Sequence, residues 1–128
     1  MRLESLHIGQ TDSKGRGVFT SELIPADTVI EIAPVIVMSL EDRKLLDRTK
    51  LYNYIFLWGE KEDRCAMALG WIPVYNHSYQ SNCEYFMDFD DETMFVKTVR
   101  LINANEELTI NYSGDWNDGT PVWLEAKE

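Results

Sequence analysis

The sequence predicts a mostly β, single-domain fold with one convincing short helix, and three observations indicate it. Short runs of β-branched, aromatic and aliphatic residues recur along the chain, and Gly, Pro, Asn or Asp separates them. Only one segment carries a clear helix-start signature. The length of 128 residues is that of one ordinary domain, and we find no internal repeat or linker that would divide it.

The N-terminal third contains the first three expected strands. Residues 3–9 form the first, and the second begins with Val18-Phe19-Thr20, after the turn residues Gly15-Arg16-Gly17. A further turn, Pro25-Ala26-Asp27, leads into the third strand. This strand, Val29–Met38, is long and nearly all β-branched or apolar.

The expected helix follows the long strand. Pro34 within that strand marks a break or an edge position, because proline cannot donate a hydrogen bond to a neighbouring strand. Ser39 is followed three residues later by Asp42, which is the pattern of a capping box at a helix start. We therefore expect one short helix over residues 40–48.

The second half of the chain returns to strands. Strand-like runs occupy residues 54–58 and 65–69, and residues 82–89 and 93–99 predict a hairpin with an acidic turn. The last expected strand, residues 107–112, alternates polar and apolar residues. This alternation places Leu108, Ile110 and Tyr112 on one face.

The composition is that of a globular protein with an excess of acid. Apolar residues make up 45% and charged residues 27%, which excludes a collagen-like or wholly disordered chain. No apolar run approaches the ~20 residues that cross a bilayer, so no membrane partner is expected. Residues 1–10 also lack the pattern of a secretory signal.

The charge balance bears on the partners of the chain. Twelve basic and 22 acidic residues give a net charge of −10. A negative surface repels nucleic acid phosphates, so direct binding to DNA or RNA is disfavoured. The same field attracts a basic peptide or protein. The plain alternative is that surplus acid only keeps a small protein dissolved.

The metal-ligating and nucleophilic residues are few. Cys65, Cys83, His7 and His77 match no common zinc spacing, so we expect no metal and two reduced thiols. Two cysteines without a disulfide framework indicate a reducing compartment, expected to be the cytoplasm, with a nuclear location not excluded. Cys83 and His77 could form a catalytic thiolate pair, but no third group stands at a recognisable spacing to orient them.

Three polar motifs stand out between the apolar runs, and each has a plain structural alternative. Gly15-Arg16-Gly17 can let a backbone approach a ligand, or can simply form a tight turn. Asn76-His77-Ser78, followed by Asn82-Cys83, can recognise a polar ligand or stabilise a turn. The run that ends at Tyr112 can place a hydroxyl in a site or bury a tyrosine in the core.

In combination and in this order, the three motifs resemble those of the SET-domain lysine methyltransferases. Gly15-Arg16-Gly17-Val18-Phe19 is similar to the GxG motif of that family. Asn76-His77-Ser78 with Asn82-Cys83 resembles its NHSxxxNC motif, and residues 106–112, EELTINY, resemble its EELTxxY motif. The matches span residues 14–112, and the short chain resembles compact, free-standing bacterial and viral members.

The resemblance implies a fold and a division of the chain. The expected SET fold consists of several small β-sheets, one or two short helices and a C-terminal pseudoknot, in which the last segment passes under a surface loop. Residues 1–128 would form one SET domain, with a core over residues 14–112 and a closing tail over residues 113–128. Small free-standing members are often homodimers, so a homodimer is one expected state.

The resemblance also implies roles for individual residues. The catalytic residue would be Tyr112. The residues that bind S-adenosylmethionine would be Lys14, Gly15, Arg16, Gly17, Asn76, His77 and Trp123. The residues that line or tune the lysine channel would be Tyr54, Tyr85, Ile110 and Trp116; Trp116, Trp123 and the two tyrosines rest on looser spacing than the motifs.

The function implied is methyl transfer from S-adenosylmethionine to a lysine side chain of a basic, histone-like protein or peptide. The alternative is a catalytically inactive SET-like module that only binds other proteins. The sequence departs from many relatives at Asn111, where they have Asp, and lacks their cysteine-rich segment after the domain. The tail or a partner would therefore have to close the site. An aliphatic Ile110 leaves the number of transferred methyl groups open.

Overall fold

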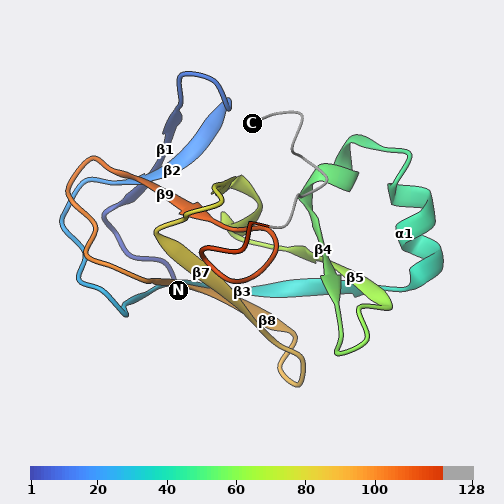
Figure 1. Ribbon diagram of the computed structural model, residues 1–128. Coiled ribbons are helices and arrows are strands. Elements are labelled where there is room, and N and C mark those ends of the chain that lie inside the picture. The colour runs from blue at the N-terminus through green and yellow to red at the C-terminus, as the bar shows by residue number, and fades with distance from the viewer. Residues whose placement is uncertain (120–128) are drawn as a thin grey trace.

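The computed structural model describes residues 1–119 and contains two β-sheets (Figure 1). The first sheet has the strand order β1-β2-β9-β6, with the bounds Leu6–Gln10, Arg16–Thr20, Glu107–Ile110 and Asn76–His77. The second has the order β4-β5-β3-β8-β7, with the bounds Ile55–Trp58, Arg64–Ala68, Val29–Met38, Thr93–Thr98 and Cys83–Asp88. The predicted mostly β fold is therefore confirmed.

The long strand β3 has the predicted bounds, and Pro34 lies where its partner changes. The residues up to Pro34 pair with β8, and Val35 to Met38 pair with β5. A strand that passes from one neighbour to another in this way joins the two halves of its sheet. Pro34 thus marks the break that the sequence indicates, without ending the strand.

The helical segments differ from the prediction. Helix α1 spans Leu40–Leu46 and begins with the predicted capping box, since Ser39 Oγ accepts from the Asp42 N–H while the Asp42 carboxylate accepts from the Ser39 N–H. The helix ends two residues before the predicted end, and none of its residues is buried. Two 3₁₀ helices that the sequence does not predict follow it: η1, Lys50–Tyr54, and η2, Ile72–Val74.

Smaller shifts occur at the strand ends. The strand predicted over residues 3–9 begins only at Leu6, and β2 begins at Arg16, so the second half of the GxG motif is inside a strand. β9 ends at Ile110. Asn111 after it is fully buried and Tyr112 is half-buried, so the predicted alternation stops two residues before the tyrosine.

One apolar core joins the two sheets. Leu108 and Ile110 of β9 are fully buried and belong to the same cluster as Ile30 and Val35 of β3. The alternation of burial along β3 and β9 reflects the two-residue period of strands. The core therefore fixes which way the motif-bearing strands face.

Two segments about thirty residues apart meet in the parallel pair of β6 and β9. Asn76 pairs with Thr109 and His77 with Ile110. The segment after β9, red in Figure 1, then folds back along the loop that follows β6, where the Ser81 N–H donates to the Trp116 carbonyl at 2.9 Å. This contact between a surface loop and the C-terminal segment is what the expected knot requires. Within residues 1–119 no helix is long and apolar enough to cross a membrane.

Candidate active site

The three motifs surround one cavity of about 200 Å³. Its lining comes from the loop before β2, from η1 and the residues beside it, from the η2 turn, from β6 and from the segment after β9. The lining residues are Lys14, Gly15, Arg16, Asn53, Tyr54, Pro73, Val74, Asn76 and Tyr112. Six of these nine are residues that the sequence predicts for the site, so motifs far apart in the sequence meet at one place.

Glycines shape the loop that enters β2. Gly15 has a φ of +72°, a left-handed conformation that residues with a side chain rarely adopt. At Gly17 a Cβ would collide with the Glu107 carboxylate and would come within 2.9 Å of the Asn76 amide nitrogen. The first glycine is thus needed for the turn, and the second leaves room for the Glu107 carboxylate and the Asn76 amide.

The Asn76 side chain ties the motifs together. Its amide nitrogen donates to the Arg16 carbonyl at 3.0 Å and to the Glu107 carboxylate at 2.8 Å. Lys14 adds a second link, because its ammonium group donates to the His77 carbonyl at 2.8 Å. Two basic residues, Lys14 and Arg16, and the Asn76 amide therefore line the cavity.

His77 and Tyr75 hold Tyr112 from two sides. The Tyr112 N–H donates to His77 Nδ1 at 3.0 Å, so Nδ1 is the unprotonated nitrogen of that ring. The Tyr112 hydroxyl donates to the Tyr75 carbonyl at 2.8 Å. The rings of His77 and Tyr112 are 5.1 Å apart. The hydroxyl thus has a fixed direction at the wall of the cavity.

Two more tyrosines lie around this position. Tyr54 lines the main cavity and a smaller one of about 10 Å³ behind it, which Tyr112 also lines. The Tyr85 hydroxyl donates to the Tyr112 carbonyl at 3.0 Å. Burial, with the nearby carboxylates of Glu62 and Asp115, raises the pKa of Tyr85 to about 12. Tyr85 is therefore a neutral hydrogen-bond donor at ordinary pH.

Comparison with known proteins identifies the family. The SET domain family matches residues 15–113, which include all three motifs and Tyr112. The chain belongs to the SET-domain family. The resemblance seen in the sequence is confirmed.

The SET domain has a curated relative and solved structural neighbours. A histone-lysine N-methyltransferase of Schizosaccharomyces pombe, specific for lysine 37 of histone H3, is 37% identical over 121 residues, which are 94% of this chain and 77% of the relative. The chain is also similar to a Plasmodium falciparum protein provisionally described as a histone methyltransferase, with a TM-score of 0.67, 26% identity, and coverage of 91% of this chain and 99% of that one. A chain of ctPRC2 has the same fold, with a TM-score of 0.73 at 18% identity, and coverage of 95% and 16%.

Among the described residues, five predicted site residues of the SET domain do not line these cavities. Gly17, His77 and Tyr85 are close to Asn76 or Tyr112, which do line them. Ile110 is fully buried in the core, so it can influence the site only through its neighbours. The Trp116 side chain is 39% exposed, and its carbonyl binds Ser81. Trp123 lies outside the described residues. The roles of these residues, like those of the other predicted site residues, stay predictions.

Sequence reasoning missed several residues that support the SET site. Asn82 accepts from the Thr109 N–H at 2.9 Å and donates to the Glu107 carbonyl at 2.8 Å, so it clamps β9; the NHSxxxNC pattern contained this signal. Phe56 is 5% exposed, and its ring lies 5.1 Å from that of Tyr85 and 6.3 Å from that of Tyr112. Nothing in the sequence distinguishes Phe56 from an ordinary core aromatic.

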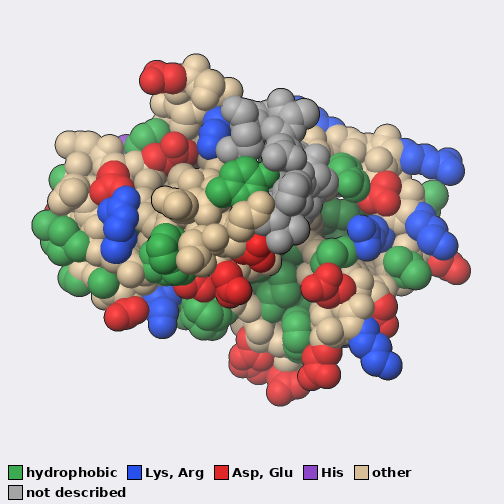
Figure 2. Space-filling model, in the orientation of Figure 1, with side chains coloured by type: hydrophobic (Ala, Val, Ile, Leu, Met, Phe, Trp, Pro, Cys, Tyr) green, Lys and Arg blue, Asp and Glu red, His purple; other side chains and the backbone are tan. Residues whose placement is uncertain are grey.

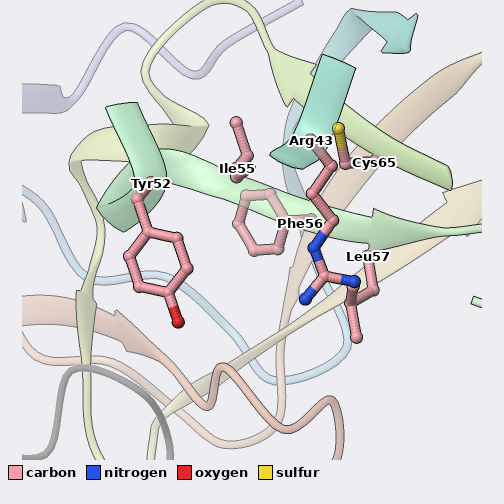
Figure 3. Close-up of a pocket in the computed structure, with 6 residues that line it drawn as sticks. All are labelled: Arg43, Tyr52, Ile55, Phe56, Leu57 and Cys65. Carbon is pink, nitrogen blue, oxygen red and sulfur yellow. The ribbon is translucent and has the colours of Figure 1, made fainter. Parts of the chain in front are cut away.

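Neither cysteine of the SET domain has the environment of a nucleophile. Cys65 lines a second cavity, of about 150 Å³, into which Arg43 and Tyr52 reach from opposite ends, with the Phe56 ring between them (Figure 3). Burial raises the pKa of Cys65 and raises that of Cys83 well above its usual range, so both thiols stay protonated. Among residues 1–119, no three His, Cys, Asp or Glu side chains are placed to hold a metal ion.

Proposed function

We propose that this SET domain transfers a methyl group from S-adenosylmethionine to the side-chain amine of a lysine in a basic protein or peptide. The observation that carries the proposal is the Tyr112 hydroxyl, held in a fixed direction at the cavity that Gly15 and Asn76 also line. The 37% identity to a histone-lysine N-methyltransferase supports it.

The residues around the cavity fit part of the proposed cofactor. The amino-acid end of S-adenosylmethionine carries one ammonium and one carboxylate group. Lys14 and Asn76 offer donors that match the carboxylate, and the backbone carbonyl of Arg16 offers an acceptor that matches the ammonium. A volume of about 200 Å³ is below the ~300 Å³ at which pockets enclose whole drug-sized ligands. The described residues would therefore hold one end of the cofactor, which supplies a methyl group on a positively charged sulfur.

The acceptor amine must be neutral to attack that methyl group. A free lysine has a pKa of about 10.4, so neutralising it at pH 7 costs about 4.6 kcal/mol. A dry, aromatic channel lowers this cost, because desolvation and a nearby positive charge both disfavour the ammonium form. Phe56, Tyr85 and Tyr54 supply such surfaces beside Tyr112. The residues would thus favour the reactive form of the amine.

Tyr112 would orient the amine and would not remove its proton. Its own proton is engaged by the Tyr75 carbonyl, which leaves lone pairs of the hydroxyl oxygen to accept from an N–H of the amine. Alignment of the reacting groups can contribute several kcal/mol to a displacement reaction. The lost proton would leave through solvent.

The charge distribution supports a basic substrate. Acidic side chains gather at the lower edge of the molecule, over the β7–β8 hairpin, whose exposed turn is Asp90-Asp91-Glu92 (Figure 2). Glu62 and Asp115 lie close enough to Tyr85 to affect its pKa. The relative from Schizosaccharomyces pombe acts on histone H3, which is a basic protein. The SET domain would attract a substrate with lysines and arginines around the target.

The competing proposal is an inactive SET-like module that binds proteins without turnover. The intact contacts of Tyr112, Asn76 and the GxG loop favour the enzyme.

We further propose a reducing, cytoplasmic location, with a nuclear one not excluded; the two buried free thiols are compatible with it.

A radiolabelled methyl-transfer assay tests the proposed function. The protein is incubated with methyl-labelled S-adenosylmethionine and mixed basic proteins, beside Tyr112→Phe and an acidic protein as controls. We expect label on basic proteins only, in lysine after hydrolysis, and much less with Tyr112→Phe. Binding of basic proteins without any transfer of label would favour the inactive module.

A further inference from the structure

A carboxylate is buried beneath the η2 turn, outside the lining of the cavity. Glu31, on β3, is 1% exposed. Its oxygens accept hydrogen bonds from the Tyr75 hydroxyl at 3.0 Å and from the Trp71 N–H at 2.8 Å. A buried carboxylate is tolerated only when it is hydrogen-bonded and paired with a cation.

The side chain of Arg2 supplies the cation. An Arg2 guanidinium nitrogen lies 3.6 Å from the Glu31 carboxylate, and the guanidinium group lies 3.5 Å from the centre of the Trp71 ring. The backbone also makes room for the carboxylate: Gly70 has a φ of +65°, and a Cβ there would collide with Glu31. The turn, the arginine and the carboxylate are thus packed as one unit.

Glu31 connects both ends of the η2 turn. Trp71 precedes η2 and Tyr75 follows it, and between them Pro73 and Val74 line the main cavity. A single carboxylate that binds the residues on both sides of this turn restricts the position of the cavity wall that Pro73 and Val74 form. Tyr75 itself is fully buried, so its ring has no freedom to swing away.

The same turn presents the group that holds Tyr112. The Tyr75 carbonyl accepts the Tyr112 hydroxyl at 2.8 Å, while the Tyr75 hydroxyl donates to Glu31. We propose that Glu31, through Tyr75, is a positioning residue that sets the direction of the Tyr112 hydroxyl. The effect on methyl-transfer rate rests on the proposed function, whereas the effect on the environment of Tyr112 does not.

Tyr75→Phe tests this coupling with little change in packing. It keeps the ring and the backbone carbonyl, and removes only the hydrogen bond to Glu31. In single-turnover methyl transfer at saturating cofactor, we expect the rate per folded molecule to fall about fivefold, within the range of coupling between contacting residues. The same substitution in a Tyr112→Phe background should change the rate by less than about 1.5-fold, because the hydroxyl being positioned is already gone.

A general structural role gives a different result. If Tyr75 only stabilised the fold, the rate per folded molecule would not fall in either background. An unchanged rate, or an equal loss in both backgrounds, overturns the proposal. Thr98→Val is the matched control: Thr98 is fully buried and binds the Pro25 carbonyl and the Thr28 N–H, away from the cavity lining. It should lower the melting temperature without changing the single-turnover rate per folded molecule in either background.

Fluorine NMR tests the proposal without any activity. The six tyrosines are replaced by 3-fluorotyrosine, and the Tyr112 resonance is assigned by its loss in Tyr112→Phe. We expect this resonance to shift in Tyr75→Phe and in Glu31→Gln, which replaces one acceptor oxygen by a donor, and to stay in place in Thr98→Val. An unmoved Tyr112 resonance in folded Glu31→Gln and Tyr75→Phe overturns the proposal. If the protein transfers no methyl group but the Tyr112 resonance shifts in both variants, the proposed function is contradicted and the positioning role of Glu31 is not.

Discussion

Asn76 makes hydrogen bonds that connect a loop, a strand and a carboxylate from three parts of the sequence. The sequence indicates its importance through the NHS pattern, but only the structure shows which atoms it uses. Its amide nitrogen is engaged by Arg16 and Glu107 at the lining of the cavity. Under the proposed function, removing the side chain would affect both the shape of the GxG loop and cofactor binding.

We predict that Asn76→Ala weakens the binding of S-adenosylmethionine at least about tenfold, or roughly 1.4 kcal/mol, while the protein stays folded. Stability should fall by about 1–2 kcal/mol, since two hydrogen bonds are lost and a partly buried carboxylate loses a donor. Calorimetric titration measures the affinity, with the exposed Asn103→Ala as a control that should bind normally. Unchanged affinity in folded Asn76→Ala would remove this residue from the site.

At the scale of elements, the least predictable features are those that packing imposes. The capping box of α1 involves residues close together in the sequence, so Ser39 and Asp42 predict the start of the helix. The end of α1 and the 3₁₀ helix η1 are harder to predict, because none of their residues is buried and no apolar period marks them. β9 ends at Ile110 because the next backbone groups bind outside the sheet: the Asn111 carbonyl accepts from the Gly114 N–H at 2.9 Å, and the Tyr112 N–H donates to His77 Nδ1. No local pattern shows these contacts.

The close contact of β2 with β9 yields a prediction for Gly17→Ala. The added Cβ would collide with the Glu107 carboxylate and crowd the Asn76 amide, so these two side chains must move and their mutual hydrogen bond is disturbed. We expect a loss of about 1–3 kcal/mol in the free energy of unfolding, as for other overpacked positions, together with weaker cofactor binding. Gly119→Ala, whose Cβ would meet nothing within 4 Å, is the control in urea denaturation. Equal stability of both variants would show that β2 and β9 are not held as described.

At the scale of the whole molecule, the sheets could be predicted only in part. Strand-forming runs indicate a mostly β chain, but the parallel pairing of β6 with β9 joins segments about thirty residues apart that share no local signal. The resemblance of the motifs predicts the SET fold, which the family match confirms, but the pairing itself is seen only in the structure. The cavity follows from this pairing, since it brings Asn76 beside the GxG loop and Tyr112.

The net charge of −10 predicts a salt dependence. Raising the ionic strength from ~0.05 to ~0.5 M shortens the Debye length to a few ångströms and screens surface attraction. We expect the KM for a lysine- and arginine-rich peptide to rise several-fold, while kcat changes little. A peptide with the same target lysine but neutral flanks is the control. Equal salt dependence for both peptides would exclude steering by surface charge.

The buried thiols predict that the folded protein carries no metal and two unreactive cysteines. Because their pKa values are raised, Cys65 and Cys83 should react with iodoacetamide only after denaturation, even at pH 8. Elemental analysis should find no stoichiometric zinc before or after treatment with a chelator. A bound zinc ion, or rapid labelling of the native protein, would contradict this description.

The central claim is that the Tyr112 hydroxyl aligns the lysine amine for methyl transfer, and single-turnover kinetics of Tyr112→Phe tests it most directly. The variant keeps the ring against His77 and loses one hydrogen bond to the Tyr75 carbonyl, so stability should change by only about 0.5–1.5 kcal/mol. We predict a methyl-transfer rate at least about tenfold lower, equivalent to about 1.4 kcal/mol of barrier, with cofactor affinity retained and the melting temperature only slightly reduced. A normal rate per folded molecule would contradict the claim and leave the hydroxyl a structural group.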